Sequence, residues 1–214
     1  SIIGNARLIK YDHEISLIKK ACRISADAHI EAMKSVKGGD SEQFIESMYI
    51  YEFSKRGARY PAYNPIVAGG ENACVLHYVE NNQQLKDDDL LLVDAGCEYE
   101  MYAADITRTF PVSGKFSDEQ LAIYKVVLDA MNAAIDMVKP GNHIMQPQEI
   151  SEKVITEGLV KLGLLDGDPE ELHKSGAYKE FYMHKIGHWL GLDVHDAGDY
   201  VEGEEYMTFK PGMI

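Results

Sequence analysis

The order of the predicted secondary structure is the feature that most limits the fold of this chain. Apolar residues recur at helical spacing over residues 12–36, and Asp40 or Ser41 is predicted to cap a second helix that ends at Gly57. Short apolar runs rich in Val, Tyr and Gly then predict strands and turns over residues 60–112. Two helices therefore precede a set of strands.

The same order begins again in the second half of the chain. Ser117 is predicted to cap a helix that ends at residues 138–141, and another helix is predicted from about Pro147 to Leu162. A loop at 167–176 and strand-like residues at 181–183 follow. Helices grouped before strands favour an α+β domain with a mainly antiparallel sheet, and the repeated order predicts an internal structural duplication.

Helical periodicity also predicts which side chains face the core. In the first helix these are Ile15, Ile18, Cys22, Ala26 and Met33, and in the second they are Phe44, Ile45, Met48 and Tyr49.

Composition and charge exclude several classes of protein. The 214 residues carry a formal net charge of -14, so clustered basic groups for binding nucleic acid are lacking and no nucleic-acid partner is expected. No apolar run approaches the ~20 residues needed to span a bilayer, and the first residues lack the layout of a signal peptide. Cys22, Cys74 and Cys97 have no CxxC spacing, which predicts reduced, mostly buried thiols. We expect a cytoplasmic protein with no membrane partner.

Two aspartates in residues 90–114 indicate a metal site. Asp94 directly follows the apolar run Leu90–Val93, and Asp105 lies eleven residues later in strand-like surroundings. If the segments form an antiparallel hairpin that turns near residues 99–100, positions whose numbers sum to 199 face each other, and the two aspartates become cross-strand neighbours. Facing carboxylates repel unless a cation or shared proton lies between them. The alternative makes Asp94 a turn residue and Asp105 the partner of Arg108.

Histidines are concentrated in HKIGHWLGLDVHD, residues 184–196. His184, His188 and His195 account for three of the eight histidines of the chain. Neutral imidazole is the commonest protein metal ligand and a proton carrier, and mixed imidazole and carboxylate donors suit Mn, Fe, Co or Zn. Two ions sharing carboxylates would lower the pKa of a bridging water and stabilise a tetrahedral intermediate.

Residues 76–116 and 181–196 together strongly resemble the bacterial aminopeptidase P (Xaa-Pro aminopeptidase) family of pita-bread metallopeptidases. The resemblance implies the pita-bread fold with a pseudo-twofold repeat, and hydrolysis of the N-terminal bond of peptides with proline at the second position. It also implies two Mn²⁺ ions and homo-oligomer assembly. It assigns Asp94, Asp105 and His188 as metal ligands and His77, His184 and His195 as the histidines that orient the scissile carbonyl and move protons.

The chain departs from the family pattern in its ligand set, in the separate N-terminal domain that typically precedes this one in the family and is not part of residues 1–214, and in one residue of the histidine-rich segment. The family carries two further glutamate ligands, the first just after a segment that resembles MTFKPGMI, so residues 1–214 hold three of five expected ligands. We therefore expect residues 1–11 to be a linker from an N-terminal domain, residues 12–214 to be a catalytic domain without its C-terminal end, and this piece to bind metal weakly or to be inactive. Lys185 replaces the glycine that usually follows the first histidine.

Three alternatives to aminopeptidase P follow from the same resemblance. Prolidase shares the fold and ligands but cleaves Xaa-Pro dipeptides, and methionine aminopeptidase matches both halves of the chain less well. A pita-bread protein that has lost catalysis would serve as a peptide-binding module. Such a protein should lack ligands at random positions, whereas every ligand expected before residue 214 is present.

Overall fold

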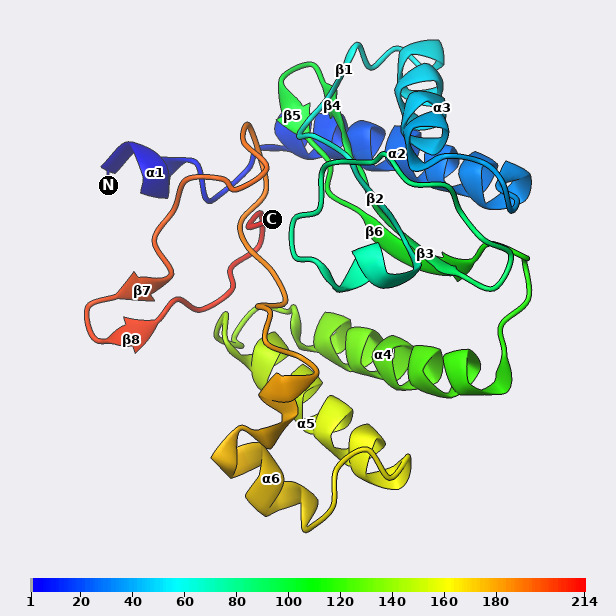
Figure 1. Ribbon diagram of the computed structural model, residues 1–214. Helices are drawn as coiled ribbons and strands as arrows, with labels where there is room; N and C mark the ends of the chain where they lie inside the picture. Colours follow the sequence, from blue (N-terminus) through cyan, green and yellow to red (C-terminus); the bar gives the residue numbers. More distant parts are fainter. Residues whose placement is uncertain (1) are drawn as a thin grey trace. The chain divides into compact units, whose positions relative to one another are not determined.

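Figure 1 shows the computed structural model, which describes residues 2–214. The chain divides into two compact units, and the division crosses the histidine-rich segment between His188 and Trp189. We call residues 10–116, 189–197 and 214 the sheet unit, and residues 2–9, 117–188 and 198–213 the helical unit.

The sheet unit combines helices with antiparallel strands, as the α+β prediction requires. Its helices are α2 (Asp12–Ser35) and α3 (Glu42–Lys55), with the 3-10 helix η1 (Gly70–Cys74). One sheet has the order β2 (Ile66–Gly69), β3 (Leu90–Asp94), β6 (Thr107–Pro111), and another has the order β1 (Tyr60–Pro61), β4 (Cys97–Tyr99), β5 (Tyr102–Ala103). Each neighbouring pair is antiparallel.

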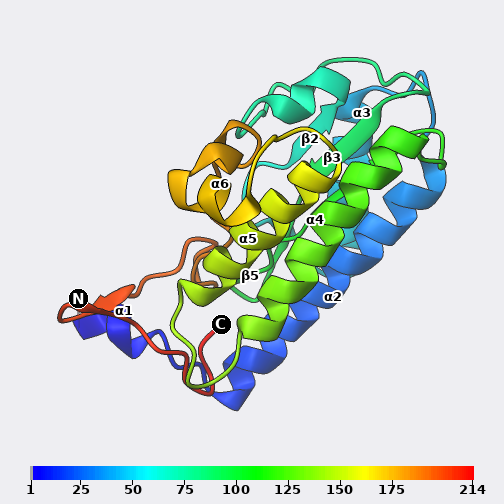
Figure 2. The ribbon, with the colours of Figure 1, turned by 90° about the horizontal axis from the view of Figure 1, so that it is seen from below.

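In the helical unit, helices α4 and α5 pack side by side (Figure 2). The elements of this unit are α1 (Ile2–Ala6), α4 (Asp118–Met137), α5 (Gln146–Lys161), α6 (Pro169–Ser175), η2 (Ala177–Glu180), β7 (Val201–Glu202) and β8 (Glu205–Tyr206). Strands β7 and β8 form a short antiparallel hairpin.

The four predicted helices are confirmed as α2, α3, α4 and α5. Two begin at the predicted serine caps: the Ser41 hydroxyl accepts a hydrogen bond from the Phe44 backbone N–H at 3.1 Å, and the Ser117 hydroxyl accepts one from Gln120 at 3.2 Å. Such caps satisfy N–H groups that have no partner within the helix. Among residues 2–214, no helix is both long and apolar enough to cross a membrane.

Helices α2 and α3 pack on the strands of the sheet unit and form its core with them. From α2 the core takes small side chains one turn apart, Ala28 and Ala32, which let the helix approach the sheet closely. Two inward-facing assignments are wrong, because Met33 and Phe44 are 39% and 50% exposed. The buried stripe of α2 instead includes the polar residue His29.

The three cysteines are free thiols, as predicted. Cys97 is buried and Cys22 is partly buried against the same core. Cys74 is exposed and is the exception to the predicted burial.

Two segments after α5 differ from the prediction. The loop predicted at 167–176 contains helix α6, because Asp168 accepts hydrogen bonds from the N–H groups of Glu170 and Glu171 and Gly176 ends the helix with a positive φ of 75°. The strand-like residues 181–183 form no strand, because the N–H groups of Phe181 and Tyr182 bond back to the carbonyl of Tyr178 and continue the turn of η2.

The hairpin that carries the two aspartates is confirmed, but its register is shifted by two residues. Asp94 faces Thr107, so facing positions sum to 201 and not to 199. The chain reverses at Glu100 and Met101, which have φ values of 49° and 75°. Positive φ at both central residues is typical of a two-residue hairpin turn whose twist matches that of the strands. Because the shift is two residues, both aspartates stay on one face of the sheet.

Gly96 lies at the closest approach within this hairpin. A Cβ atom built there would overlap the carbonyl group of Ala104. The N–H of Ala104 donates to the Cys97 carbonyl at 2.9 Å, and the N–H of Ala95 donates to the Ile106 carbonyl at 3.1 Å. Glycine therefore lets the two chains pair across the gap between the β3–β6 and β4–β5 ladders, next to Asp105.

Candidate functional site

Asp94 and Asp105 are brought together in the sheet unit by a shared hydrogen-bond donor. Asp94 is the last residue of β3, and Asp105 lies between β5 and β6. Tyr63 lies in the connection between β1 and β2, and its hydroxyl donates a hydrogen bond of 2.5 Å to Oδ1 of Asp94. The same hydroxyl oxygen lies 3.2 Å from Oδ1 of Asp105. One phenol therefore touches both carboxylates.

The electrostatics of this pair favour a cation. Burial raises the pKa of Asp94, and the neighbouring charge of Asp105 raises it further, whereas hydrogen bonds from Tyr63 and Thr107 act in the opposite direction. Burial and the two carboxylates also raise the pKa of the Tyr63 phenol, which therefore stays protonated and donates. Two like charges held this close in a partly buried place are stabilised when a cation neutralises them.

The donor chemistry of the pair fits a divalent metal. Carboxylate oxygens are hard donors of the kind that bind divalent cations. Within residues 2–214, no group of three or more His, Cys, Asp or Glu side chains that could hold a metal ion is found. Asp94 and Asp105 are therefore the part of the expected ligand set that the structure joins. The alternative interpretation made Asp94 a turn residue and Asp105 the partner of Arg108. Asp94 instead ends strand β3, and the hydrogen bond described for Arg108 is to the Thr107 carbonyl at 2.7 Å.

His184 and His188 belong to the helical unit and are its last histidines before the division at Trp189. His184 is exposed, and its Nδ1 lies 2.6 Å from the carbonyl oxygen of Lys185. Because a carbonyl oxygen only accepts, Nδ1 is the donor in this hydrogen bond. His188 is half-buried.

His195 belongs to the sheet unit and lies in a segment that is bonded to β5. The carbonyl of Gly191 accepts a hydrogen bond of 2.8 Å from Ala103, the last residue of β5 and two positions before Asp105. The next residue after His195, Asp196, forms a salt bridge of 3.0 Å with Lys10, and both side chains are almost fully buried, with exposed fractions of 2% for Lys10 and 1% for Asp196. The exposed His195 is thus attached to a fixed stretch of backbone.

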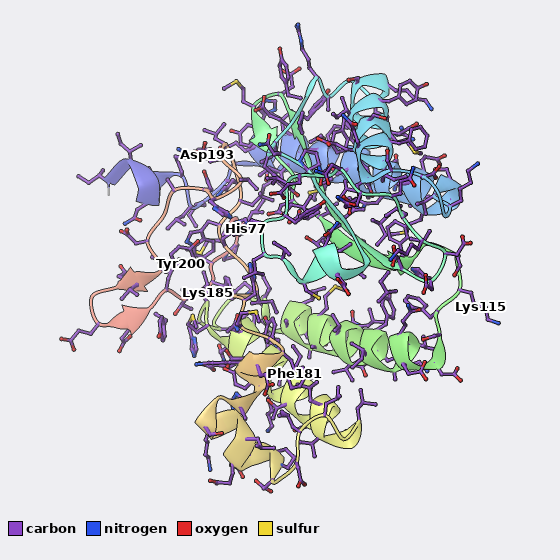
Figure 3. The ribbon with its side chains drawn as sticks, in the orientation of Figure 1. His77, Lys115, Phe181, Lys185, Asp193 and Tyr200 are labelled. Carbon is purple, nitrogen blue, oxygen red and sulfur yellow. The ribbon has the colours of Figure 1, made fainter. Side chains whose placement is uncertain are left out.

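His77 lies in the connection between η1 and β3 and is exposed (Figure 3). Its φ of 56° is uncommon for a residue with a side chain and indicates a backbone held by its surroundings. The holding group is the fully buried carboxylate of Glu42. It accepts hydrogen bonds from two donors on this connection, the Tyr78 hydroxyl at 2.7 Å and the Gln83 N–H at 3.0 Å. Two more donors precede the connection, the N–H of Gly69 in β2 and Nδ2 of Asn72 in η1, both at 2.9 Å.

Glu42 makes the stability of this connection depend on pH. Burial acts to raise its pKa, but the hydrogen bonds outweigh burial and the pKa lies below the ordinary 4.5. A lowered folded-state pKa means that the carboxylate stabilises the protein above the pKa of the unfolded chain, and that this stabilisation is lost as pH falls through the folded-state pKa. We expect Glu42→Gln to lower the free energy of unfolding by about 1–3 kcal/mol at pH 7. The urea concentration at the midpoint of unfolding should then decrease less between pH 7 and pH 3 than in the unmodified protein. An equal decrease in the two proteins would contradict this assignment.

Sequence reasoning missed four residues that shape the site. Tyr63, Thr107, Glu42 and Lys10 all act through partners distant in sequence or across a ladder, and no spacing motif marks them. The signal that could have found Thr107 is the hairpin register, because it directly faces Asp94.

Comparison with known proteins gives consistent matches. The model of metallopeptidase family M24 matches residues 16–214. A curated protein of Haemophilus influenzae named Xaa-Pro aminopeptidase is 49% identical over 99% of this chain, and one of Escherichia coli with the same name is 45% identical over 100% of it. The chain spans about half the length of these relatives, 51% and 48%.

Solved structures agree with the sequence matches. The structure of Pseudomonas aeruginosa aminopeptidase PepP matches 99% of this chain with a TM-score of 0.98 and 52% identity, and 48% of that chain is covered. A zinc-substituted aminopeptidase P of Escherichia coli in complex with product has a TM-score of 0.96 and 45% identity, with 99% of this chain and 48% of that chain covered. The matches confirm the family resemblance and the α+β pita-bread fold class.

Proposed function

Because the chain belongs to metallopeptidase family M24, we propose that the protein containing it removes the N-terminal residue from peptides whose second residue is proline. The observation that carries this proposal is the joining of Asp94 and Asp105 by one tyrosine hydroxyl on a single face of the sheet unit. The names of the relatives support the choice of substrate, since both are called Xaa-Pro aminopeptidase.

Membership of a metallopeptidase family implies a divalent metal. We propose two Mn²⁺ ions, held by Asp94 and Asp105 together with the imidazole of His188 and further ligands outside residues 1–214. When bound, they supply Lewis acidity and lower the pKa of a water molecule. The phenol of Tyr63 donates to Oδ1 of Asp94. The two oxygens of a carboxylate offer about four lone-pair sites, so ligand sites remain beside the hydrogen bonds from Tyr63 and Thr107.

The remaining histidines are proposed to act on the peptide. His77 and His195 extend from backbone that Glu42 and the Lys10–Asp196 pair hold in place, which suits groups that must orient a scissile carbonyl. His184 is proposed to move protons around the reacting carbonyl, because an imidazole can both accept and donate a proton. Homo-oligomer assembly is proposed by analogy with the family alone.

The experiment compares three substrates on the full-length protein. With Mn²⁺ supplied, we expect release of the first residue from an Xaa-Pro-Xaa tripeptide at a kcat/KM at least about tenfold above that of the Xaa-Pro dipeptide, and no cleavage of an Xaa-Ala-Xaa control. A preference for the dipeptide would support the alternative function, prolidase. Peptide binding without hydrolysis would support a non-catalytic peptide-binding module.

We further propose that residues 1–214 by themselves bind Mn²⁺ weakly and are inactive, because they contain three of the five ligands that the family resemblance implies. Metal analysis after dialysis, together with calorimetric titration of this chain and of the full-length protein, tests the difference. Tight binding of two Mn²⁺ ions per chain by residues 1–214 would refute this part of the proposal.

A further inference from the structure

His29 is a buried histidine that the proposed chemistry does not use. It lies on α2 with 2% of its surface exposed, within the core of the sheet unit. Its Nε2 lies 3.1 Å from the carbonyl oxygen of Ala95, and its Nδ1 lies 2.9 Å from the hydroxyl of Tyr49 on α3.

These partners determine the proton positions of the ring. A carbonyl oxygen only accepts, so Nε2 carries the hydrogen and donates it to the Ala95 carbonyl. Nδ1 is then the acceptor, and the Tyr49 hydroxyl donates to it. Burial lowers the pKa of His29, although the hydrogen bond to the Ala95 carbonyl acts in the opposite direction, so the ring stays neutral in this arrangement.

His29 contacts Ala95 where the two chains that carry the aspartates pair. Ala95 follows Asp94, and Ile106 follows Asp105. The N–H of Ala95 donates to the Ile106 carbonyl at 3.1 Å, so the imidazole holds, through the Ala95 carbonyl, a residue that pairs with the second chain. Among the hydrogen bonds described for Ala95 and Ile106, the contact with His29 is the one that a side chain makes.

Helix α2 holds this segment at a second point one turn away. The Ser25 hydroxyl accepts a hydrogen bond of 3.0 Å from the N–H of Cys97. Ser25 lies four residues before His29 on the helix, and Cys97 lies two residues after Ala95. Four helical residues rise about 6 Å, and two strand residues rise about 6.7 Å, so the two spacings match. Ser25 and His29 therefore act as paired attachments of α2 to residues 95–97.

We propose that His29 is a positioning residue for the candidate metal centre. It sets the spacing of Asp94 and Asp105 by holding Ala95, which follows Asp94 and pairs with Ile106, the residue that follows Asp105. The inference rests on the proposed function only in calling the pair a metal centre. This role requires no contact of His29 with either carboxylate and gives His29 no part in the reaction.

The test measures metal affinity and local backbone protection in the full-length protein. In His29→Leu, which removes both hydrogen bonds, we expect Mn²⁺ affinity to fall about 10- to 100-fold, the size typical of lost outer-shell support. His29→Gln retains an N–H donor that can reach Ala95, and its affinity should stay within about threefold of the original. Tyr49→Phe keeps the ring but removes its orienting donor and should fall between them.

Ile24→Ala is the matched control for a purely structural role. Ile24 is 1% exposed on the same helix, and its truncation should cost stability of about 2–5 kcal/mol without changing Mn²⁺ affinity. Equal losses of affinity in Ile24→Ala and His29→Leu, or unchanged affinity in His29→Leu, would overturn the proposal.

Hydrogen exchange of the metal-free protein separates this inference from the proposed function. In His29→Leu, the Ala95 amide should lose protection relative to the amide of Val112, which bonds to Asp89 at the other end of the β3–β6 ladder. If both amides lose protection equally, His29 does not hold this point and the inference fails. If the unmodified protein binds no Mn²⁺, the proposed function fails, whereas the exchange result still decides whether His29 holds the two chains.

Discussion

Replacing Asp94 with asparagine is expected to lower Xaa-Pro hydrolysis by the full-length protein about 10³-fold, because a metal ion supplies several kcal/mol of transition-state stabilisation and each 1.36 kcal/mol is tenfold in rate. The same substitution should stabilise the metal-free protein. Asp94 is partly buried beside Asp105, and removal of its charge removes the repulsion between them. The charge of Asp94 is therefore expected to destabilise the folded protein when no cation is bound.

Kinetics and thermal unfolding of the Asp94→Asn and Asp105→Asn variants measure both effects. The unfolding temperature of each metal-free variant should rise, and the stabilisation by added Mn²⁺ seen in the unmodified protein should disappear. Glu98→Gln is a suitable control, because Glu98 is a carboxylate on the neighbouring β4 and is not a proposed ligand. A variant that loses activity, loses stability without metal and keeps the response to Mn²⁺ would show that Asp94 is structural.

Replacing Lys10 with methionine is expected to destabilise the protein by about 3–5 kcal/mol, since breaking a buried ion pair leaves a charge inside the protein without its partner. The Lys10 ammonium and the Asp196 carboxylate are 3.0 Å apart and 186 residues apart in sequence, and both are shielded from water. The Cβ position of Gly191 is filled by these two side chains, so the pair also fixes the backbone that precedes His195.

Urea unfolding of Lys10→Met, Asp196→Asn and the double variant measures the interaction free energy between the two side chains apart from their other contacts. We expect the double variant to be more stable than the sum of the two single losses predicts, with a coupling free energy above about 1 kcal/mol. Lys174→Met provides the control, because Lys174 forms exposed ion pairs with Glu170 and Glu171 that should contribute less than about 1 kcal/mol. Similar losses for Lys10→Met and Lys174→Met would contradict the account of the buried pair.

Local signals predicted the helices and their ends well. Ser41 and Ser117 are recognised as caps because a serine hydroxyl can bond the free N–H groups of a first helical turn wherever the helix packs. Helix α6 was missed because seven residues are too few to show a helical period, although Asp168 before Pro169 and Gly176 at the end are the usual boundary signals.

The hairpin register and the supports of the site needed the structure. Glu100 and Met101 adopt positive φ without being glycine or asparagine, so the residue types did not distinguish this turn from the one expected near residues 99–100. Tyr63 is 31 residues from Asp94, and Lys10 is 186 residues from Asp196. Such pairings depend on how the strands and helices pack, which spacing along a chain does not encode. The aspartates themselves were predictable because carboxylates next to buried strands need a partner.

Anomalous diffraction from crystals of the full-length protein loaded with Mn²⁺ tests the central claim most directly. We expect two manganese peaks in contact with the carboxylates of both Asp94 and Asp105, with the imidazole of His188 as a ligand of one of them. Manganese peaks that contact neither aspartate, or no ordered manganese at the two carboxylates that share the Tyr63 hydroxyl, would contradict the account.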